Sequence, residues 1–261
     1  MSTEHLLTLV QFLSAFYFCG KATQRCFQYI SRKLLARSIR VQRPILAEAC
    51  HEYAVVQVSG PWAMEDRTLV YPLGLPSLGA TLFGVFDGHH GHSASQFLVD
   101  NLGAVVQHEL YENKSLGVAP ALHAAFRQID KSYLAIPHHD SGSTSCVLVV
   151  ADGKLTVANT GDSRCILVST LGRVTELSQD HKPDRPDELD RIASLGGSVS
   201  HWGVWRLEGV LAMSRAIGDR TLKQYAIPDP EVVEHTVSPT DRYVVLATDG
   251  VWDVLSNAEW I

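Results

Sequence analysis

Three apolar runs in this chain each end at an aspartate. Runs of five or six apolar and β-branched residues that are bounded by Gly and Asp are typical of buried strands. The sequence therefore predicts carboxylates at the ends of buried strands, where they repel one another unless a cation lies between them. The runs and the residues that follow them are TLFGVF before Asp87, LTVANT before Gly161-Asp162, and YVVLAT before Asp249.

A fourth apolar run provides a contrast within the same sequence. Residues 146–151 (CVLVVA) precede Asp152-Gly153, but another strand pattern follows at once. This spacing is typical of a two-residue hairpin turn. We therefore interpret Asp152 as a turn residue without a chemical role.

Carboxylates at separate points of the sequence form a candidate site for hard divalent cations such as Mg²⁺ and Mn²⁺. Two such ions bridged by one carboxylate suit phosphate ester hydrolysis, because they polarise phosphoryl oxygens and lower the pKa of a water. A neighbouring His could protonate the leaving oxygen, and His89 follows Asp87-Gly88 directly. His90 and His92 lack the paired His and Cys spacing of a zinc site. The candidate ligands are Glu65, Asp66, Asp87, Asp162, Asp249 and Asp253.

Composition limits the class of protein. The chain has 261 residues and a net charge of −6, which argues against a basic nucleic-acid-binding face. Its five cysteines include no CxxC pair, so we expect a reducing compartment and no disulfide scaffold. We find no linker after about residue 50 and predict one domain over 50–261, preceded by a distinct segment over 1–49.

The N-terminal segment leaves three alternatives open. Residues 6–18 are mostly apolar, and residues 21–43 carry Lys and Arg but no Asp or Glu. The segment could anchor the chain in a membrane, with the basic flank and the enzyme on the cytoplasmic side. It could instead be a mitochondrial transit segment, which is Arg-rich and poor in acids. The third alternative is an amphipathic helix packed on the domain.

The remaining pattern groups strands into hairpins with helix pairs between them. A first strand is predicted at 53–58, and helices are predicted after Gly88 up to Tyr111 and from Pro120 to Tyr133. A short helix over 187–195 could be capped by Asp184 or Asp187, and Ser256 with Glu259 forms a capping box that opens another helix. Such grouping favours an α+β fold of antiparallel sheets with helices outside.

Seven motifs occur in order along the chain. They are Met64-Glu65-Asp66, Asp87-Gly88-His89-His90-Gly91, Ser141-Gly142-Ser143-Thr144, Ala158-Asn159-Thr160-Gly161-Asp162-Ser163-Arg164, Asp180-His181-Lys182-Pro183, Leu211-Ala212-Met213-Ser214-Arg215-Ala216-Ile217-Gly218-Asp219 and Asp249-Gly250-Val251-Trp252-Asp253. This series resembles the metal-dependent type 2C serine/threonine protein phosphatases. The resemblance covers residues 50–261, and residues 205–219 with 227–230 are most similar to membrane-anchored, metazoan-type members.

The resemblance implies a β-sandwich of two antiparallel sheets flanked by helix pairs, with two bound metal ions. Asp87 would bridge the two ions, and the Gly88 carbonyl would be a further ligand. Glu65 would bind the second ion with support from Asp66, and Asp249 would bind the first.

The same resemblance assigns the remaining residues of the motifs. Asp162 and Asp253, with Asp249, would form a weaker third metal site, and His89 would be the general acid. We interpret Asp219 and Arg215, which share one motif, as structural residues that hold a loop near the site; a metal-ligand role for Asp219 is the alternative.

The implied function is hydrolysis of phosphoserine and phosphothreonine by a water that two Mg²⁺ or Mn²⁺ ions activate. The expected partners are phosphoprotein substrates, with no nucleic acid. Membrane association would run through residues 6–43, and we expect a monomer.

Two departures from the family pattern support an alternative function. The arginine that grips the substrate phosphate in the family is missing before Met64, and Arg67 lies on the other side of the motif, so the phosphate-binding residue is unknown. The closing Asp-Asn motif and the last strands are also missing, so we expect a C-terminally truncated domain. The alternative is thus a catalytically weakened, phosphatase-like binding module or a truncated isoform.

Overall fold

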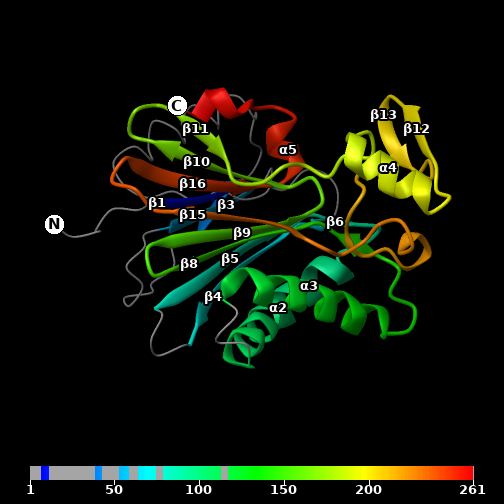
Figure 1. The fold of residues 1–261 in the computed structure, drawn as a ribbon, viewed down its shortest axis with the longest axis horizontal. Coiled ribbons are helices and arrows are strands. Elements are labelled where there is room, and N and C mark those ends of the chain that lie inside the picture. Colours follow the sequence, from blue (N-terminus) through cyan, green and yellow to red (C-terminus); the bar gives the residue numbers. More distant parts are fainter. Residues whose placement is uncertain are drawn as a thin grey trace.

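Two β-sheets packed face to face form the centre of the molecule, with helices on the outside (Figure 1). The structure is a computed structural model that describes residues 7–11, 39–42, 53–58, 64–74, 79–112 and 117–260. The five-stranded sheet has the order β15 (Glu231–Thr236), β9 (Lys154–Thr160), β8 (Ser145–Ala151), β5 (Ala80–Phe86) and β4 (Arg67–Leu73). The six-stranded sheet has the order β11 (Val174–Glu176), β10 (Arg164–Ser169), β16 (Asp241–Ala247), β1 (Leu7–Gln11), β3 (Tyr53–Val58) and β2 (Ile39–Gln42).

The apolar runs are continuous because the strands of the five-stranded sheet are buried on both faces. Alternate side chains of a strand point to opposite faces of its sheet. Phe83 on β5 and Leu148 on β8 face the other sheet, where they pack against Leu246 of β16. Leu82 and Val147, one position earlier on each strand, pack against the helices. This double burial explains why no polar alternation is visible in these segments.

The predicted strands are confirmed to within one or two residues at their ends. Pairing within the five-stranded sheet is antiparallel throughout, as predicted. Asp152 and Gly153 have φ angles of 49° and 71°, which fit a type I′ hairpin turn between β8 and β9. The six-stranded sheet corrects the prediction in one respect, because β1 runs parallel to both β16 and β3.

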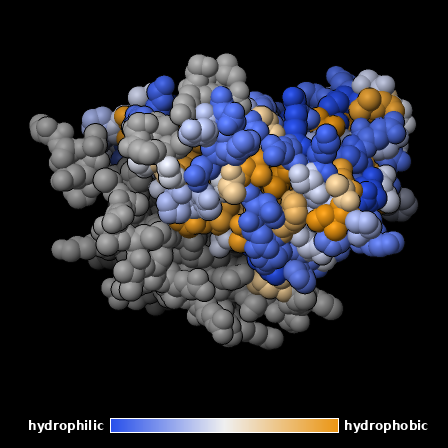
Figure 2. All heavy atoms as spheres, turned by 90° about the horizontal axis from the view of Figure 1, so that it is seen from below, coloured by the Kyte–Doolittle hydropathy of each residue, from blue (hydrophilic) through white to orange (hydrophobic). Residues whose placement is uncertain are grey.

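The helices cover the outer faces of the sheets. Helices α2 (Ser93–Glu112) and α3 (Val118–Leu134) pack as a pair on the five-stranded sheet, as predicted. On the six-stranded sheet, Trp252 of α5 (Asp249–Trp252) and Trp260 of the 3₁₀ helix η2 (Asn257–Trp260) pack against Ile166 and Val245. Seen from the α2 and α3 side, the described surface is mostly hydrophilic with hydrophobic groups between (Figure 2).

Two smaller units lie beside the sandwich. A three-stranded sheet has β7 (Gly142–Ser143) at its centre, between β6 (Gly88–His89) and β14 (Ile217–Gly218). The second unit consists of α4 (Pro186–Ser194) and the hairpin of β12 (Val199–Trp202) and β13 (Val204–Leu207), and it lies at one end of the molecule (Figure 1). Ile192, Leu207 and Leu211 form its small core.

The predicted caps of two helices need correction. Arg185 occupies the N-cap of α4 without a side-chain hydrogen bond, and Pro186 is the first helical residue. Neither Asp184 nor Asp187 caps the helix; instead Asp187 accepts hydrogen bonds from the Arg185 guanidinium. Of the two hydrogen bonds of the predicted capping box, the structure shows the one in which the Glu259 carboxylate accepts the Ser256 backbone N–H, at 2.9 Å. The helix that follows is a 3₁₀ helix.

Most of the N-terminal segment lies outside the described residues. The two parts that are described, Leu7–Gln11 and Ile39–Gln42, are strands rather than helices. β1 and β2 pair with β16 and β3 in one sheet, while the predicted division at residue 50 stays a prediction. None of the helices within the described ranges is both long and apolar enough to cross a bilayer.

Candidate functional site

Four of the predicted carboxylates gather at one end of the sandwich. Asp66 precedes β4, Asp87 follows β5, Asp162 follows β9, and Asp249 begins α5 after β16. The strand ends bring these residues together from positions up to 183 residues apart (249 − 66). We call Asp66, Asp87, Asp162 and Asp249 the acidic cluster.

The electrostatics of the acidic cluster are those of like charges held together. Burial raises the pKa of Asp87 well above its usual value, and the negative charges of Asp66, Asp249 and Asp162 raise it further. Burial also raises the pKa of Asp249, whose side chain hydrogen-bonds to that of Asp87. Two carboxyl groups in such contact favour a shared proton over two charges.

Asp162 is the most completely buried member, with no exposed surface. Burial raises its pKa to about 6, although Lys182 opposes that shift. The Lys182 ammonium donates to Asp162 Oδ2 at 2.6 Å. Asp162 Oδ1 is buried and has no hydrogen-bond partner among the described residues. An orphaned buried carboxylate oxygen costs free energy, so it indicates a group that completes the site when bound.

These residues fit a divalent cation by their chemistry. Carboxylate oxygens are the preferred ligands of Mg²⁺ and Mn²⁺, and an added positive charge would lower the raised pKa values of Asp87 and Asp249. Among the described residues, no group of three or more Asp, Glu, His or Cys side chains is arranged to hold an ion as it stands.

The other predicted ligands lie around the acidic cluster. The Glu65 carboxylate accepts the Gly91 backbone N–H at 3.0 Å. Gly88 lies so close to the Glu65 backbone that a Cβ there would be 2.6 Å from the Glu65 carbonyl oxygen. Asp253 is exposed and lies one helical turn after Asp249, with its N–H donating to the Asp249 carbonyl at 2.8 Å.

His89, the predicted general acid, is held by a carboxylate that we had interpreted as structural. Its Nε2 atom lies 2.8 Å and 3.0 Å from the two carboxylate oxygens of Asp219. Asp219 is nearly buried, at 3% exposure, whereas His89 retains 17%. The remaining ring nitrogen, His89 Nδ1, is buried and lacks a hydrogen-bond partner.

Sequence reasoning gave no role to Lys182 and Thr144 and only a structural role to Asp219, although all three residues lie in the family motifs. Lys182 supplies a cation to Asp162, and Asp219 supplies a carboxylate to His89. Thr144 Oγ1 accepts the Asp87 backbone N–H at 3.0 Å and so fixes the strand end that carries Asp87. The family motifs mark these residues as candidates for the site. No rule of sequence spacing predicts that Asp219 contacts a histidine 130 positions earlier.

Arg67 holds one of the loops of the site in place. Its Nη1 donates to the carbonyl oxygens of Met64 and Asp66, each at 2.9 Å. Its Nε donates to Gln96 Oε1 at 2.8 Å. The guanidinium thus holds the loop that carries Glu65 and Asp66 against helix α2.

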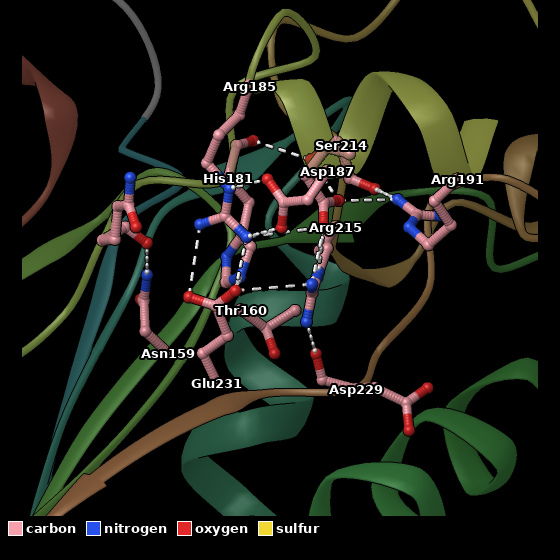
Figure 3. A network of polar contacts seen from close by, with 12 residues as sticks. Asn159, Thr160, His181, Arg185, Asp187, Arg191, Ser214, Arg215, Asp229 and Glu231 are labelled. Atoms are coloured by element: carbon pink, nitrogen blue, oxygen red, sulfur yellow. Dashed lines mark hydrogen bonds and ion pairs between the residues drawn. The ribbon is translucent and has the colours of Figure 1, made fainter. Parts of the chain in front are cut away.

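A second group of buried charges lies next to the acidic cluster. Glu188 on α4 is 1% exposed and accepts hydrogen bonds from Arg215, Arg191 and Ser214. Arg185 joins this group to Glu231 on β15 (Figure 3). We call Glu188, Arg191, Ser214, Arg215, Arg185 and Glu231 the Glu188 cluster. It fastens the α4 unit to the five-stranded sheet.

Comparison with known proteins identifies the family of this site. Residues 63–261 match the family model described as Protein phosphatase 2C. "Probable protein phosphatase 2C 59" from Arabidopsis thaliana is 42% identical over 182 residues, covering 68% of this chain and 57% of the relative. "Probable protein phosphatase 2C member 13, mitochondrial" from Oryza sativa subsp. japonica is 39% identical, covering 77% and 61%. This chain spans 40% to 61% of the length of the curated relatives it matches.

Solved structures give the same result for the fold. The crystal structure of serine-threonine phosphatase 2C from Toxoplasma gondii has a TM-score of 0.64 and 29% identity, covering 77% of this chain and 78% of that one. A C. elegans sex-determining protein has a TM-score of 0.70 at 23% identity, covering 90% and 60%, and supports the fold alone. The predicted fold class is therefore confirmed.

Proposed function

This chain belongs to the protein phosphatase 2C family, and from that premise we propose that it hydrolyses phosphoserine and phosphothreonine in phosphoproteins with the help of Mg²⁺ or Mn²⁺. The observation that carries this proposal is the acidic cluster. Its buried carboxylates raise one another's pKa values, and Asp162 Oδ1 has no partner. Stability alone gives no reason to hold like charges so close together.

The ions, when bound, would polarise the phosphoryl oxygens and make a water more acidic. Asp87, with the Gly88 carbonyl, would hold both ions, as the family resemblance implies. Glu65 and Asp66 would hold the second ion, and Asp249 the first. Asp162 and Asp253 would complete a weaker third site.

The protein side chains supply positioning and a proton. Arg67 and Thr144 fix the loop and the strand end that carry the carboxylates. His89, three positions after the end of β5, lies beside the cluster and would protonate the serine or threonine oxygen as its bond to phosphorus breaks.

Phosphopeptide hydrolysis tests the proposal. The chain is assayed with a phosphothreonine peptide in MnCl₂ and in EDTA, together with Asp249→Ala and the distant control Asp241→Asn. We expect Mn²⁺-dependent release of phosphate from wild type and from the control, and background release from Asp249→Ala. Equal rates for Asp249→Ala and wild type would refute the function.

A non-catalytic phosphopeptide-binding module is the second candidate, and Arg67 favours it. Its Nε and Nη1 donors are committed to Gln96, Met64 and Asp66, which makes it a weaker substitute for the phosphate-gripping arginine of the family pattern. Calorimetric titration with the same peptide separates the candidates. Binding without release of phosphate supports the module, whereas turnover excludes it.

We propose two alternatives for the location of the chain, and the printed name of one relative supports the second. Residues 6–43 would place it on the cytoplasmic face of a membrane or direct it to mitochondria, as the rice relative is named mitochondrial. Fractionation of cells that express the chain with a C-terminal tag distinguishes them. Carbonate-resistant membrane association supports an anchor, and protease protection inside mitochondria supports a transit segment.

A further inference from the structure

We propose that Asp219 is the positioning residue for His89, and that the three-stranded sheet β6–β7–β14 exists to align the two. This inference rests on the proposed function, because it takes His89 as the proton donor to the leaving oxygen. The proton would leave His89 Nδ1 as the P–O bond breaks, while Nε2–H stays hydrogen-bonded to the Asp219 carboxylate.

The contact between the two residues is close and shielded from water. Both carboxylate oxygens of Asp219 lie within 3.0 Å of His89 Nε2. At 3% exposure, Asp219 is screened much less by solvent than a surface carboxylate would be. A carboxylate that accepts from one ring nitrogen fixes the tautomer and the orientation of the imidazole. The other nitrogen, Nδ1, is then the one left to meet a reacting group; it is buried and has no hydrogen-bond partner among the described residues.

The small sheet places the pair directly across its central strand. Gly142 on β7 is the register partner of His89 on β6 and of Gly218 on β14. A Cβ on Gly142 would overlap both His89 Nε2 and an Asp219 carboxylate oxygen. Glycine at this position therefore leaves the space in which the two side chains meet.

Asp219 is itself held firmly in an uncommon backbone conformation. Its φ of 50° and ψ of 54° place it in the left-handed region, which is rare for residues other than glycine. The carbonyl of Asp219 accepts the Leu222 N–H at 2.9 Å. Just before it, the Gly218 N–H donates to Asp130 Oδ1 at 2.8 Å, and Lys223 pairs with the same oxygen at 2.9 Å. Strained residues that the surroundings fix in this way are concentrated at functional sites.

The need for a proton depends on the leaving group, and this dependence gives a specific test. A serine or threonine alkoxide is a strong base and needs protonation as it leaves, whereas 4-nitrophenolate does not. A residue that acts through His89 should therefore matter for a phosphothreonine peptide and not for 4-nitrophenyl phosphate. A purely structural residue would affect both substrates equally.

The experiment measures kcat and KM for both substrates in MnCl₂ with wild type, His89→Ala, Asp219→Asn and Gly142→Ala. The control is Asp241→Asn, because Asp241 pairs with His235 at 2.7 Å away from the site. For His89→Ala we expect kcat on the peptide to fall about 100-fold or more. For Asp219→Asn and Gly142→Ala we expect a loss of at least about 10-fold on the peptide, with 4-nitrophenyl phosphate turnover within about 3-fold of wild type.

The outcomes separate the inference from the function on which it rests. If His89→Ala lowers both substrates equally or neither, the acid role of His89 is wrong. If His89→Ala is selective for the peptide but Asp219→Asn and Gly142→Ala are not, the positioning role of Asp219 is wrong. Thermal melts identify a variant that fails to fold, and the other of the two variants then decides.

Discussion

Two groups of carboxylates, one around the buried Asp162 and one around the buried Glu188, lie side by side in this protein and have opposite electrostatics. In the acidic cluster, burial and neighbouring acids raise the pKa of Asp87, and Lys182 is the cation that contacts Asp162. In the Glu188 cluster, burial alone would raise the pKa of Glu188, but hydrogen bonds from Arg215, Arg191 and Ser214 outweigh it and lower the pKa to about 2. The same residue types therefore form a candidate metal site in one place and a structural joint in the other.

The difference lies in how much positive charge the chain itself supplies. Each Glu188 carboxylate oxygen is paired with an arginine: Oε2 with Arg191 and Oε1 with Arg215. The acidic cluster is left with an unpartnered oxygen on Asp162. A buried charge is tolerated when it is paired, and an unpaired one indicates a missing partner.

The largest expected effect is on activity. Replacing Asp87 with Asn should reduce Mn²⁺-dependent phosphopeptide hydrolysis by more than about 100-fold, because it would remove the carboxylate that we propose holds both ions. The metal-free variant should melt at the same temperature as wild type or higher, since one repelling charge is gone. If Asp87→Asn hydrolysed the peptide at the wild-type rate, or if it were clearly less stable than wild type without metal, the acidic cluster would not differ from the Glu188 cluster in the way we propose.

The second effect is on stability at the joint. Replacing Glu188 with Ala should lower the free energy of unfolding by about 3–5 kcal/mol, because it leaves buried arginines without their partner. Urea titration measures this change. The matched control is Asp190→Ala on the exposed side of the same helix, which should change stability by no more than about 0.5 kcal/mol. A Glu188→Ala variant as stable as this control would contradict the structural role.

The third effect is the stabilisation that an added cation provides. At MnCl₂ near 100 times its dissociation constant, wild type should gain about 2.7 kcal/mol of stability, and EDTA should reverse the gain. Asp249→Asn should lose most of this gain, whereas Asp190→Asn should retain it. Thermal shift measurements with and without MnCl₂ make the comparison. An unchanged gain in Asp249→Asn would exclude this carboxylate as a ligand.

The smallest expected effect is on how the free energy of unfolding depends on pH in the acid range. Because the folded-state pKa of Glu188 is lowered to about 2 from its usual 4.5, its charge stabilises the fold above pH 4.5. That contribution is lost as the pH falls from about 4.5 towards 2. In Glu188→Gln, the dependence of the free energy of unfolding on pH across this window should be shallower. An identical slope in wild type and variant would show that Glu188 does not contribute.

Much of the fold was predictable because the signals were local. Continuous apolar runs that end in Gly or Asp predicted β5, β8, β9 and β16, and the Asp152-Gly153 turn followed from spacing. Strand burial and turn chemistry are properties of short segments. The parallel pairing of β1 and the arginine at the N-cap of α4 were not predictable, since both depend on distant neighbours.

The sequence alone determined that carboxylates stand at the ends of buried strands, because alternation, apolarity and turn residues are written in consecutive positions. The tertiary structure decided how each charge is used. It pairs the Lys182 ammonium with Asp162 and the Asp219 carboxylate with His89. It also places three arginines around Glu188. The physical reason is that the pKa of a buried group depends on burial and on charges within a few ångströms, and residues far apart in the sequence supply most of these.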